Sequence, residues 1–172
     1  EATSALPAGE IRIFVIATEL GEALFNMGTY AAQSARLWGL SWGAEDLAAD
    51  LGALANRVNG RYTDPYRLAR TLCLYAAAAA GVPAYETVCV ELDDPELLRA
   101  ETEEARRDGF AGKVAIHPKH LAVINEVYMP LEVEREWARK IVAAFDANPE
   151  AGAFRLEGKM IDRPHLKAAR RV

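Results

Sequence analysis

Four apolar runs with the character of β-strands alternate with helical segments along most of this chain, and that alternation restricts its fold more than any other feature. The first run, 11–17, has almost no polar alternation, as in a strand buried on both faces. A strand–helix order repeated four times predicts an α/β fold with a parallel sheet and right-handed crossovers. The expected strands are 11–17, 37–42, 87–92 and 113–116.

The intervening segments have helical spacing or helix-ending residues. An alanine-rich stretch ends at Gly81, where glycine is a typical helix terminator. One polar insertion, 56–65, contains the turn-forming pair Asn59-Gly60. The expected helices are 20–34, 47–54, 66–80, 96–107, 119–127, 131–145 and 164–171.

Ionisable side chains follow all four expected strands. The carboxyl ends of parallel strands share one edge of the sheet, where α/β proteins bind their ligands. The side chains at these exits are Glu19, then Glu45 and Asp46, then Asp93 and Asp94, then His117.

Glu19 and Asp46 are the strongest candidates for a metal site. They are one strand–helix–strand unit apart, so they should stand side by side at the sheet edge. Hard carboxylate oxygens suit Mg²⁺, which keeps water or substrate oxygens in its other positions. The alternative is that each acid only complements the helix it precedes. Glu45 is expected to assist, because an adjacent residue normally points elsewhere.

The Gly43-Ala44 turn is a candidate anion site, because it places the backbone amides of Gly43, Ala44 and Glu45 at a helix start. His117 is interpreted as a structural group rather than a catalytic one. Asp162 precedes a helix with Pro164 in its first turn, which is typical of a helix cap. The chain also has a loose basic cluster, interpreted as solvated surface rather than a phosphate site: Arg57, Arg61, Arg67 and Arg70.

Composition excludes several classes of protein. The formal net charge is −5, and without a long basic run a duplex nucleic-acid partner has little support, whereas small anionic ligands remain open. Cys73 and Cys89 lie in apolar segments, which predicts reduced, buried thiols in a cytoplasmic protein. No apolar run reaches the ~18 residues of a membrane span, and the first residues lack the pattern of a signal peptide. The chain starts at Glu1 rather than Met, so a processed, truncated or partly ordered product is expected.

Four segments together resemble a known family. IATEL at 16–20, GLSWGAEDLAADLGA at 39–53, AIHPKH at 115–120 and EGKMIDRPHL at 157–166 are similar to CoA-ester lyases related to the citrate lyase beta subunit. That group includes malyl-CoA and citramalyl-CoA lyases, and 4-hydroxy-2-oxo-acid aldolases are more distantly similar. The resemblance extends over essentially the whole chain.

The resemblance implies a (β/α)8 barrel of the TIM type. Residues 1–147 would carry about the last four strand–helix units, and 148–172 a C-terminal lid. It also implies Mg²⁺ bound by Glu19 and Asp46, and Asp162 reaching the active site of a neighbouring subunit in a homo-oligomer, a trimer or hexamer. About four further units precede residue 11 in the family, so we expect a longer chain or a partner to supply the missing half.

The function expected from this resemblance is carbon–carbon bond cleavage in a 3-hydroxyacyl-CoA, giving acetyl-CoA or a homologue and a 2-oxo acid, or the reverse. Two alternatives remain open. One is an incomplete, non-catalytic homologue that acts as a binding or assembly module, and the other is an aldolase for free 2-oxo acids. The GKMID segment favours the CoA-ester branch.

Overall fold

The computed structural model describes residues 6, 7, 9–31 and 33–172 of the chain. They form two compact units, Glu1–Tyr128 and Met129–Val172. Residues 1–5, part of the start compared above with a signal peptide, lie outside the described residues. Within the described part, no helix is long and apolar enough to cross a bilayer.

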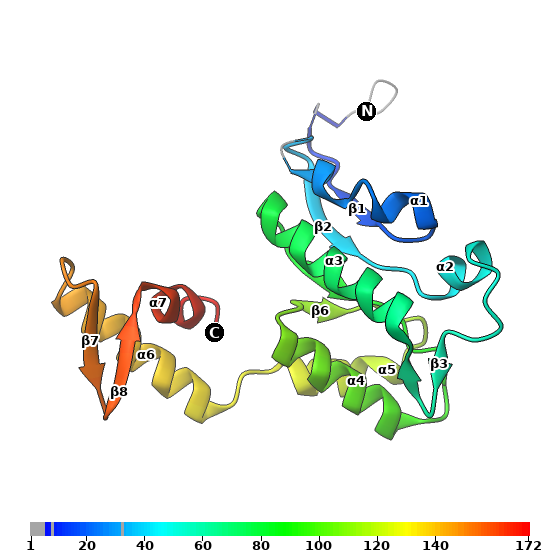
Figure 1. Cartoon of the computed structure of the whole chain (residues 1–172). Helices are drawn as coiled ribbons and strands as arrows, with labels where there is room; N and C mark the ends of the chain where they lie inside the picture. Colours follow the sequence, from blue (N-terminus) through cyan, green and yellow to red (C-terminus); the bar gives the residue numbers. More distant parts are fainter. Residues whose placement is uncertain (1–5, 8, 32) are drawn as a thin grey trace. The chain divides into compact units, whose positions relative to one another are not determined.

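The first unit is built on a four-stranded, entirely parallel sheet with the order β1-β2-β5-β6 (Figure 1). Sequential strands are neighbours, as in a barrel-type β/α arrangement. The predicted α/β class and parallel sheet of four units are therefore confirmed. The strands are β1 (Ile13–Ile16), β2 (Leu37–Ser41), β5 (Ala84–Glu86) and β6 (Gly112–Lys113).

Two predicted strand positions were wrong. The third strand lies before 87–92, because Ala84 and Tyr85 pair with β2. The apolar run that followed instead supplies Cys89 to a small core with Leu98 and Ile124. The apolar residues of 87–92 therefore indicate burial and not strand pairing. The fourth strand is only Gly112–Lys113, shorter than the predicted 113–116.

The first strand is not buried on both faces, contrary to the prediction. Ile13 and Val15 are half-buried, whereas Phe14 and Ile16 are exposed. On the exposed face, the Phe14 ring lies 5.4 Å from the Tyr85 ring, which stacks on Trp38 at 5.3 Å. This face of the sheet therefore presents an aromatic cluster that no described residue covers fully.

The segment after β1 is broken rather than one helix over 20–34, of which residue 32 lies outside the described part. It contains α1 (Gly21–Leu24) and the 3-10 helix η1 (Met27–Tyr30). The Asn26 side chain donates to the Glu22 carbonyl, and the Thr29 hydroxyl donates to the Asn26 carbonyl. Such local bonds compete with the helical pattern.

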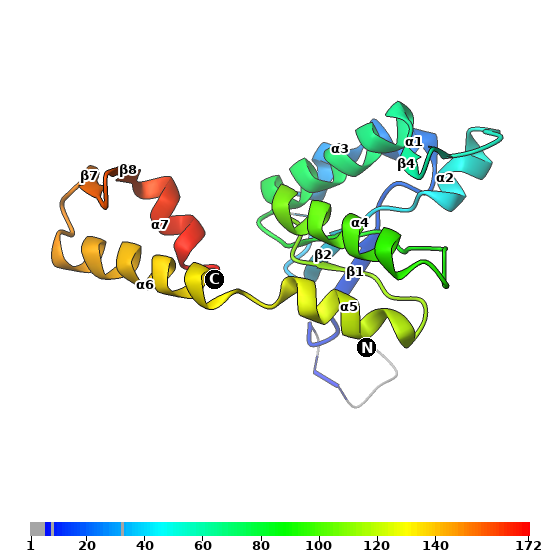
Figure 2. The ribbon, with the colours of Figure 1, turned by 90° about the horizontal axis from the view of Figure 1, so that it is seen from below.

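Helices α3 and α4 pack along the sheet of the first unit (Figures 1 and 2). Gly81 and Gly109 terminate them with φ of 71° and 107°, the left-handed conformation of a helix C-cap. The polar insertion is a hairpin whose turn residues, Asn59 and Gly60, have positive φ, as a two-residue turn requires. These elements are α2 (Glu45–Asp50), β3 (Arg57–Val58), β4 (Arg61–Tyr62), α3 (Asp64–Ala80), α4 (Pro95–Asp108) and α5 (Lys119–Tyr128).

The second unit has its own small core. Buried Ile141 and Phe145 of one helix pack with Ile161 and Leu166, and the Phe145 ring meets Phe154 edge-on at 4.7 Å. The boundary predicted from sequence lies after residue 147, whereas the compact units divide between Tyr128 and Met129. The elements are α6 (Glu132–Ala147), β7 (Ala153–Leu156), β8 (Lys159–Asp162) and α7 (Arg163–Ala169).

Candidate active site

The exits of β1 and β2 are tied together by Thr18 and Gly43. The Gly43 amide donates to Thr18 Oγ1 at 3.1 Å, and that hydroxyl donates to the Gly43 carbonyl at 3.3 Å. One step earlier, the Ala17 amide donates to the Ser41 carbonyl at 2.8 Å. Thr18 is fully buried, so the two chain segments are fixed where they leave the sheet.

Glu19 lies directly against Gly43. A Cβ added to Gly43 would stand 3.1 Å from Glu19 Cγ and 3.3 Å from Ile16 Cγ2. Glycine at this position therefore leaves the space that the Glu19 side chain occupies. The carboxylate reaches the start of the segment that leads into α2.

Asp46 is in the first turn of α2, three residues after Gly43, and it is exposed. The neighbouring Glu45 side chain instead contacts Asn56, because Glu45 Oε1 accepts from Asn56 Nδ2 at 2.8 Å. Among the described residues, neither Glu19 nor Asp46 has a hydrogen bond or ion pair through its carboxylate. Two free carboxylates thus stand beside one glycine turn.

The end of α2 is also held by α1. The Gly21 amide donates to Asp50 Oδ2 at 2.7 Å, which joins the segment after Glu19 to the last turn of α2.

No group of three or more His, Cys, Asp or Glu side chains with metal-site geometry occurs in the described residues. A metal here would therefore take two protein carboxylates, with water or substrate oxygens completing its coordination, as Mg²⁺ commonly does.

Glu86, at the end of β5, is the centre of a buried polar network that the sequence analysis did not identify. Its Oε1 accepts from Trp42 Nε1 at 2.5 Å and from the Thr87 amide at 2.9 Å. Its Oε2 accepts from Arg70 Nε at 2.6 Å, and Arg70 Nη1 reaches Asp108 at 2.7 Å. Glu86 precedes the run predicted as a strand, 87–92, so the predicted strand exits did not include it.

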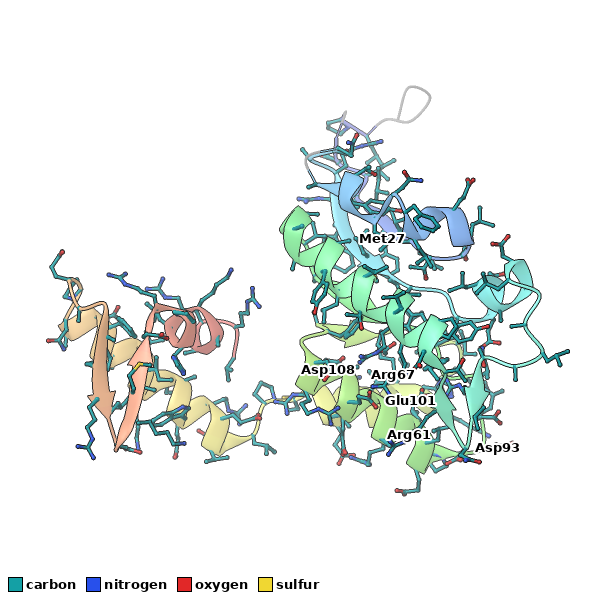
Figure 3. All side chains as sticks on the ribbon, viewed as in Figure 1. Met27, Arg61, Arg67, Asp93, Glu101 and Asp108 are labelled. Atoms are coloured by element: carbon teal, nitrogen blue, oxygen red, sulfur yellow. The ribbon has the colours of Figure 1, made fainter. Side chains whose placement is uncertain are left out.

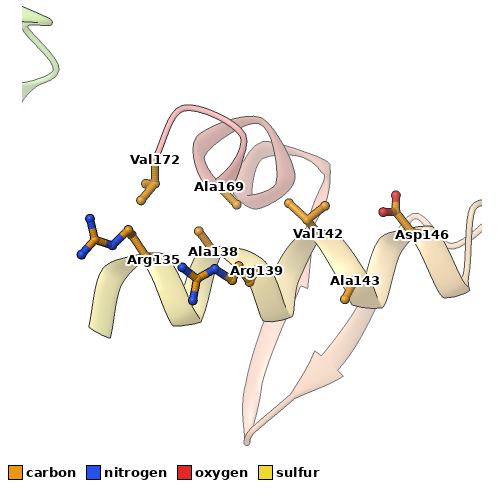
Figure 4. Close-up of a pocket in the computed structure, with 8 residues that line it drawn as sticks. All are labelled: Arg135, Ala138, Arg139, Val142, Ala143, Asp146, Ala169 and Val172. Atoms are coloured by element: carbon orange, nitrogen blue, oxygen red, sulfur yellow. The ribbon is translucent and has the colours of Figure 1, made fainter. Parts of the chain in front are cut away.

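A second ionic cluster joins the hairpin to α4. Arg57 pairs with Glu101, and its guanidinium lies 3.9 Å from the centre of the Tyr62 ring. Lys113 Nζ reaches Glu101 Oε2 at 3.1 Å and the Thr87 carbonyl at 2.8 Å. Figure 3 shows Glu101 and Asp108 on α4, with Arg61 and Arg67 also labelled. The predicted basic cluster consists of Arg57, Arg61, Arg67 and Arg70. Arg57 is paired with Glu101 and Arg70 with Glu86, so the four arginines do not form a phosphate site together.

The polar groups after β5 and β6 have local structural roles. Asp94 accepts from the Leu97 amide and caps α4, and Asp93 pairs with Lys119 at 3.0 Å. His117 Nδ1 accepts from the Lys119 amide at 3.1 Å, which agrees with the structural role favoured from sequence. These exits therefore hold the loops in place.

A pocket of about 240 Å³ lies beside these loops and is lined by Asp93, Asp94, Lys119 and His120. His120 is 1% exposed, and neither ring nitrogen has a hydrogen-bond partner among the described residues. Burial lowers the pKa of His120, and the nearby His117, Lys113 and Lys119 lower it further. Protonation of the His120 ring is thus disfavoured in the folded protein.

Both cysteines are buried and unpaired in the structure, as predicted. Burial raises the pKa of the Cys73 thiol to about 12, and the nearby Glu86 carboxylate adds to this effect. Burial likewise raises the pKa of Cys89. Neither thiol is suited to act as a nucleophile.

Asp162 ends β8 in the second unit, immediately before α7. Its Oδ1 lies 2.5 Å from Nδ1 of His165, and its amide nitrogen is 3.3 Å from the same atom. The predicted position at a helix N-terminus is confirmed. The partner, His165, was not identified from sequence.

The fold and this site define an α/β protein with free carboxylates at the carboxyl edge of a barrel-type sheet. Residues 6–118 match the model of the HpcH/HpaI aldolase/citrate lyase family, and the chain belongs to this family.

Three relatives illustrate the relationship. The chain is 40% identical over 132 residues to a citrate lyase subunit beta-like protein of Mycobacterium tuberculosis, covering 76% of this chain and 48% of that protein. It is 35% identical over 133 residues to the mitochondrial citramalyl-CoA lyase of Rattus norvegicus, covering 76% and 38%. The crystal structure of protein CitE from Mycobacterium tuberculosis with magnesium, acetoacetate and coenzyme A superposes with a TM-score of 0.73 at 31% identity, covering 94% of this chain and 66% of that one. The chain thus spans about half the length or less of these two curated relatives.

Proposed function

We propose that this protein takes part in Mg²⁺-dependent carbon–carbon bond cleavage, or formation, in a 3-hydroxyacyl-CoA such as malyl-CoA or citramalyl-CoA. The products are acetyl-CoA, or a homologue, and a 2-oxo acid. The observation that carries this proposal is the placement of free Glu19 and Asp46 carboxylates beside the Gly43 turn at the β1 and β2 exits. The relatives named citramalyl-CoA lyase and CitE, the latter with magnesium and coenzyme A, support it.

Glu19 and Asp46 would hold the Mg²⁺ ion. Their oxygens are of the type Mg²⁺ prefers, both are exposed, and no described residue neutralises either one. When bound, the ion supplies Lewis-acid polarisation of the 2-oxo acid carbonyl. Gly43 contributes by leaving space for Glu19.

The start of α2 would bind the carboxylate of the 2-oxo acid. The sequence assigned this task to amides at Gly43, Ala44 and Glu45. The Gly43 amide already donates to Thr18, so the donors left for a substrate are those of Ala44 and Glu45, at the unsatisfied end of the helix.

Asp162 would exchange the proton at the carbon next to the thioester. In the cleavage direction its carboxyl group gives a proton to the enolate carbon, and in the condensation direction its carboxylate removes one. By the resemblance, this residue acts on the site of a neighbouring subunit in a homo-oligomer. We place the reaction in the cytoplasm, where buried thiols remain reduced.

Replacing the proposed ligands tests the proposal. Asp46→Ala and Glu19→Gln should each weaken Mg²⁺ binding, measured by calorimetry, and abolish turnover of malyl-CoA and citramalyl-CoA. Glu22→Gln, which neutralises another exposed acid close to the same strand exit, is the matched control and should retain both. Undiminished Mg²⁺ binding and turnover in Asp46→Ala would refute the assignment.

A binding or assembly module is the second candidate. It is favoured by the aromatic cluster of Phe14, Trp38 and Tyr85 on an incompletely covered face of the sheet. Intact-mass spectrometry combined with turnover assays separates the two functions. A 172-residue product without acyl-CoA turnover would favour the module.

The family description also includes aldolases. Turnover of pyruvate-derived aldols without CoA would identify that activity instead.

A further inference from the structure

The clearest unassigned contact in the second unit joins Asp162 to His165. Nδ1 of His165 lies 2.5 Å from Oδ1 of Asp162, the two side chains being 47% and 32% exposed. Two lone pairs cannot approach to this distance, so a proton lies between the two atoms. The imidazole provides it by carrying a proton on Nδ1.

The amide nitrogen of Asp162 lies farther from Nδ1, at 3.3 Å. An imidazole nitrogen carries either a proton or a lone pair, so Nδ1 cannot donate to Oδ1 and accept from this amide at once. The shorter contact decides the tautomer. His165 therefore has Nδ1–H directed at Oδ1.

From this geometry we infer that His165 is the positioning residue of Asp162: it holds Oδ1 by a hydrogen bond and leaves Oδ2 free to exchange a proton with substrate. The inference rests on the proposed function of Asp162. In cleavage the proton on Oδ2 moves to the enolate carbon, and the resulting carboxylate keeps its bond from Nδ1–H. His165 neither gains nor loses a proton.

The β7–β8 ladder and the first turn of α7 hold the two residues in place. Asp162 is opposite Ala153 in the β7–β8 ladder, and His165 is in the first turn of α7, three residues on. Arg163, between them, is directed elsewhere, because its Nη2 donates to the Pro149 carbonyl at 2.8 Å. The simpler alternative is that the pair only closes the start of α7, as in a capping box.

The tautomer of His165 can be read by ¹⁵N NMR of the whole chain, with no need for turnover. We expect the Nδ1–H form in the native protein and a return to the Nε2–H form in Asp162→Ala. An Nε2–H tautomer in the native protein would overturn the inference.

Kinetics separate positioning from capping. His165→Leu removes the donor and should lower kcat/KM on the order of tenfold or more, the value of a hydrogen bond to a charged group. In the condensation direction, where the Asp162 carboxylate removes the proton, the loss of this donor should also move the acid limb of the pH profile upward. His165→Asn, whose amide nitrogen can replace Nδ1, should restore the native profile. Lys140→Ala, which breaks the exposed pair with Glu157 in the same unit, is the control and should change neither.

These experiments separate the proposed catalytic role of Asp162 from the proposed positioning role of His165. Full activity in Asp162→Ala would refute the catalytic role of Asp162. An inactive Asp162→Ala together with a native pH profile in His165→Leu would refute the role of His165 alone.

Discussion

Thr18 and Gly43 exchange two hydrogen bonds, amide to hydroxyl at 3.1 Å and hydroxyl to carbonyl at 3.3 Å. One buried side chain thereby joins the exits of two neighbouring parallel strands. Glu19 follows the first residue of this pair, and the α2 turn that carries Asp46 follows the second. The relative position of the two proposed ligands therefore depends on this contact.

Removing the Thr18 hydroxyl should loosen the site. Thr18→Val keeps the shape of the side chain but leaves the Gly43 amide without its partner, at a cost of about 1–3 kcal/mol in unfolding free energy. Denaturant unfolding measures this loss, and calorimetry should show weaker Mg²⁺ binding. Thr18→Ser, which retains the hydroxyl, should keep most of the Mg²⁺ affinity. Equal affinities in the Val and Ser variants would contradict the coupling.

Adding one methyl group to Gly43 should displace Glu19. In Gly43→Ala the new Cβ would lie 3.1 Å from Glu19 Cγ, closer than ordinary packing allows. We expect Mg²⁺ affinity to fall at least tenfold and stability to fall by about 1–3 kcal/mol, the usual cost of overpacking.

Gly28→Ala is the matched control for this change. A Cβ there meets no described atom within 4 Å, so its Mg²⁺ affinity should be unchanged. Normal affinity in Gly43→Ala would show that Glu19 does not depend on this space.

Arg70 should be required for stability because Glu86 is buried. The Glu86 side chain is 4% exposed and bonds to Arg70 at 2.6 Å. Arg70→Ala leaves that carboxylate without its cation and should cost about 3–5 kcal/mol in denaturant unfolding.

The double variant Arg70→Met with Glu86→Gln removes both charges and should recover part of this loss. Equal stabilities of Arg70→Ala and the native protein would show that Trp42 and Thr87 alone satisfy Glu86.

Sequence periodicity predicted the parallel sheet because helical segments separate the strands and each crossover brings the next strand alongside. It misplaced β5 because 87–92 is as apolar as a strand. In that segment Cys89 instead packs in a small core with Leu98, and the strand that joins the parallel sheet lies earlier, at Ala84–Glu86. Burial and strand pairing have the same signature in composition, and only the partner strand separates them.

The candidate site shows the same limit. Glu19 and Asp46 were predicted as ligands because strand exits share an edge, a rule that needs only the order of elements. The Thr18–Gly43 bonds and the Glu86–Arg70 pair were not found. They connect residues 25 and 16 positions apart through side-chain directions that spacing does not specify.

The buried imidazole of His120 should make stability depend on pH. Burial lowers its pKa in the folded protein. Near neutral pH both folded and unfolded chains hold it neutral, but below about pH 6.5 the unfolded chain binds the proton first. Unfolding free energy should therefore fall as the pH drops below about 6.5, until the folded-state pKa is passed.

His120→Leu isolates this contribution. Neither ring nitrogen has a partner among the described residues, so replacing the ring with an apolar side chain of similar size leaves no new polar group unsatisfied. Denaturant unfolding at pH 7.5 should show stability equal to or above that of the native protein. Between about pH 5 and 6.5 the native protein should lose stability relative to His120→Leu. Parallel curves for the two proteins across that range would mean that His120 takes up its proton equally well folded and unfolded, which a fully buried imidazole without a hydrogen-bond partner cannot do.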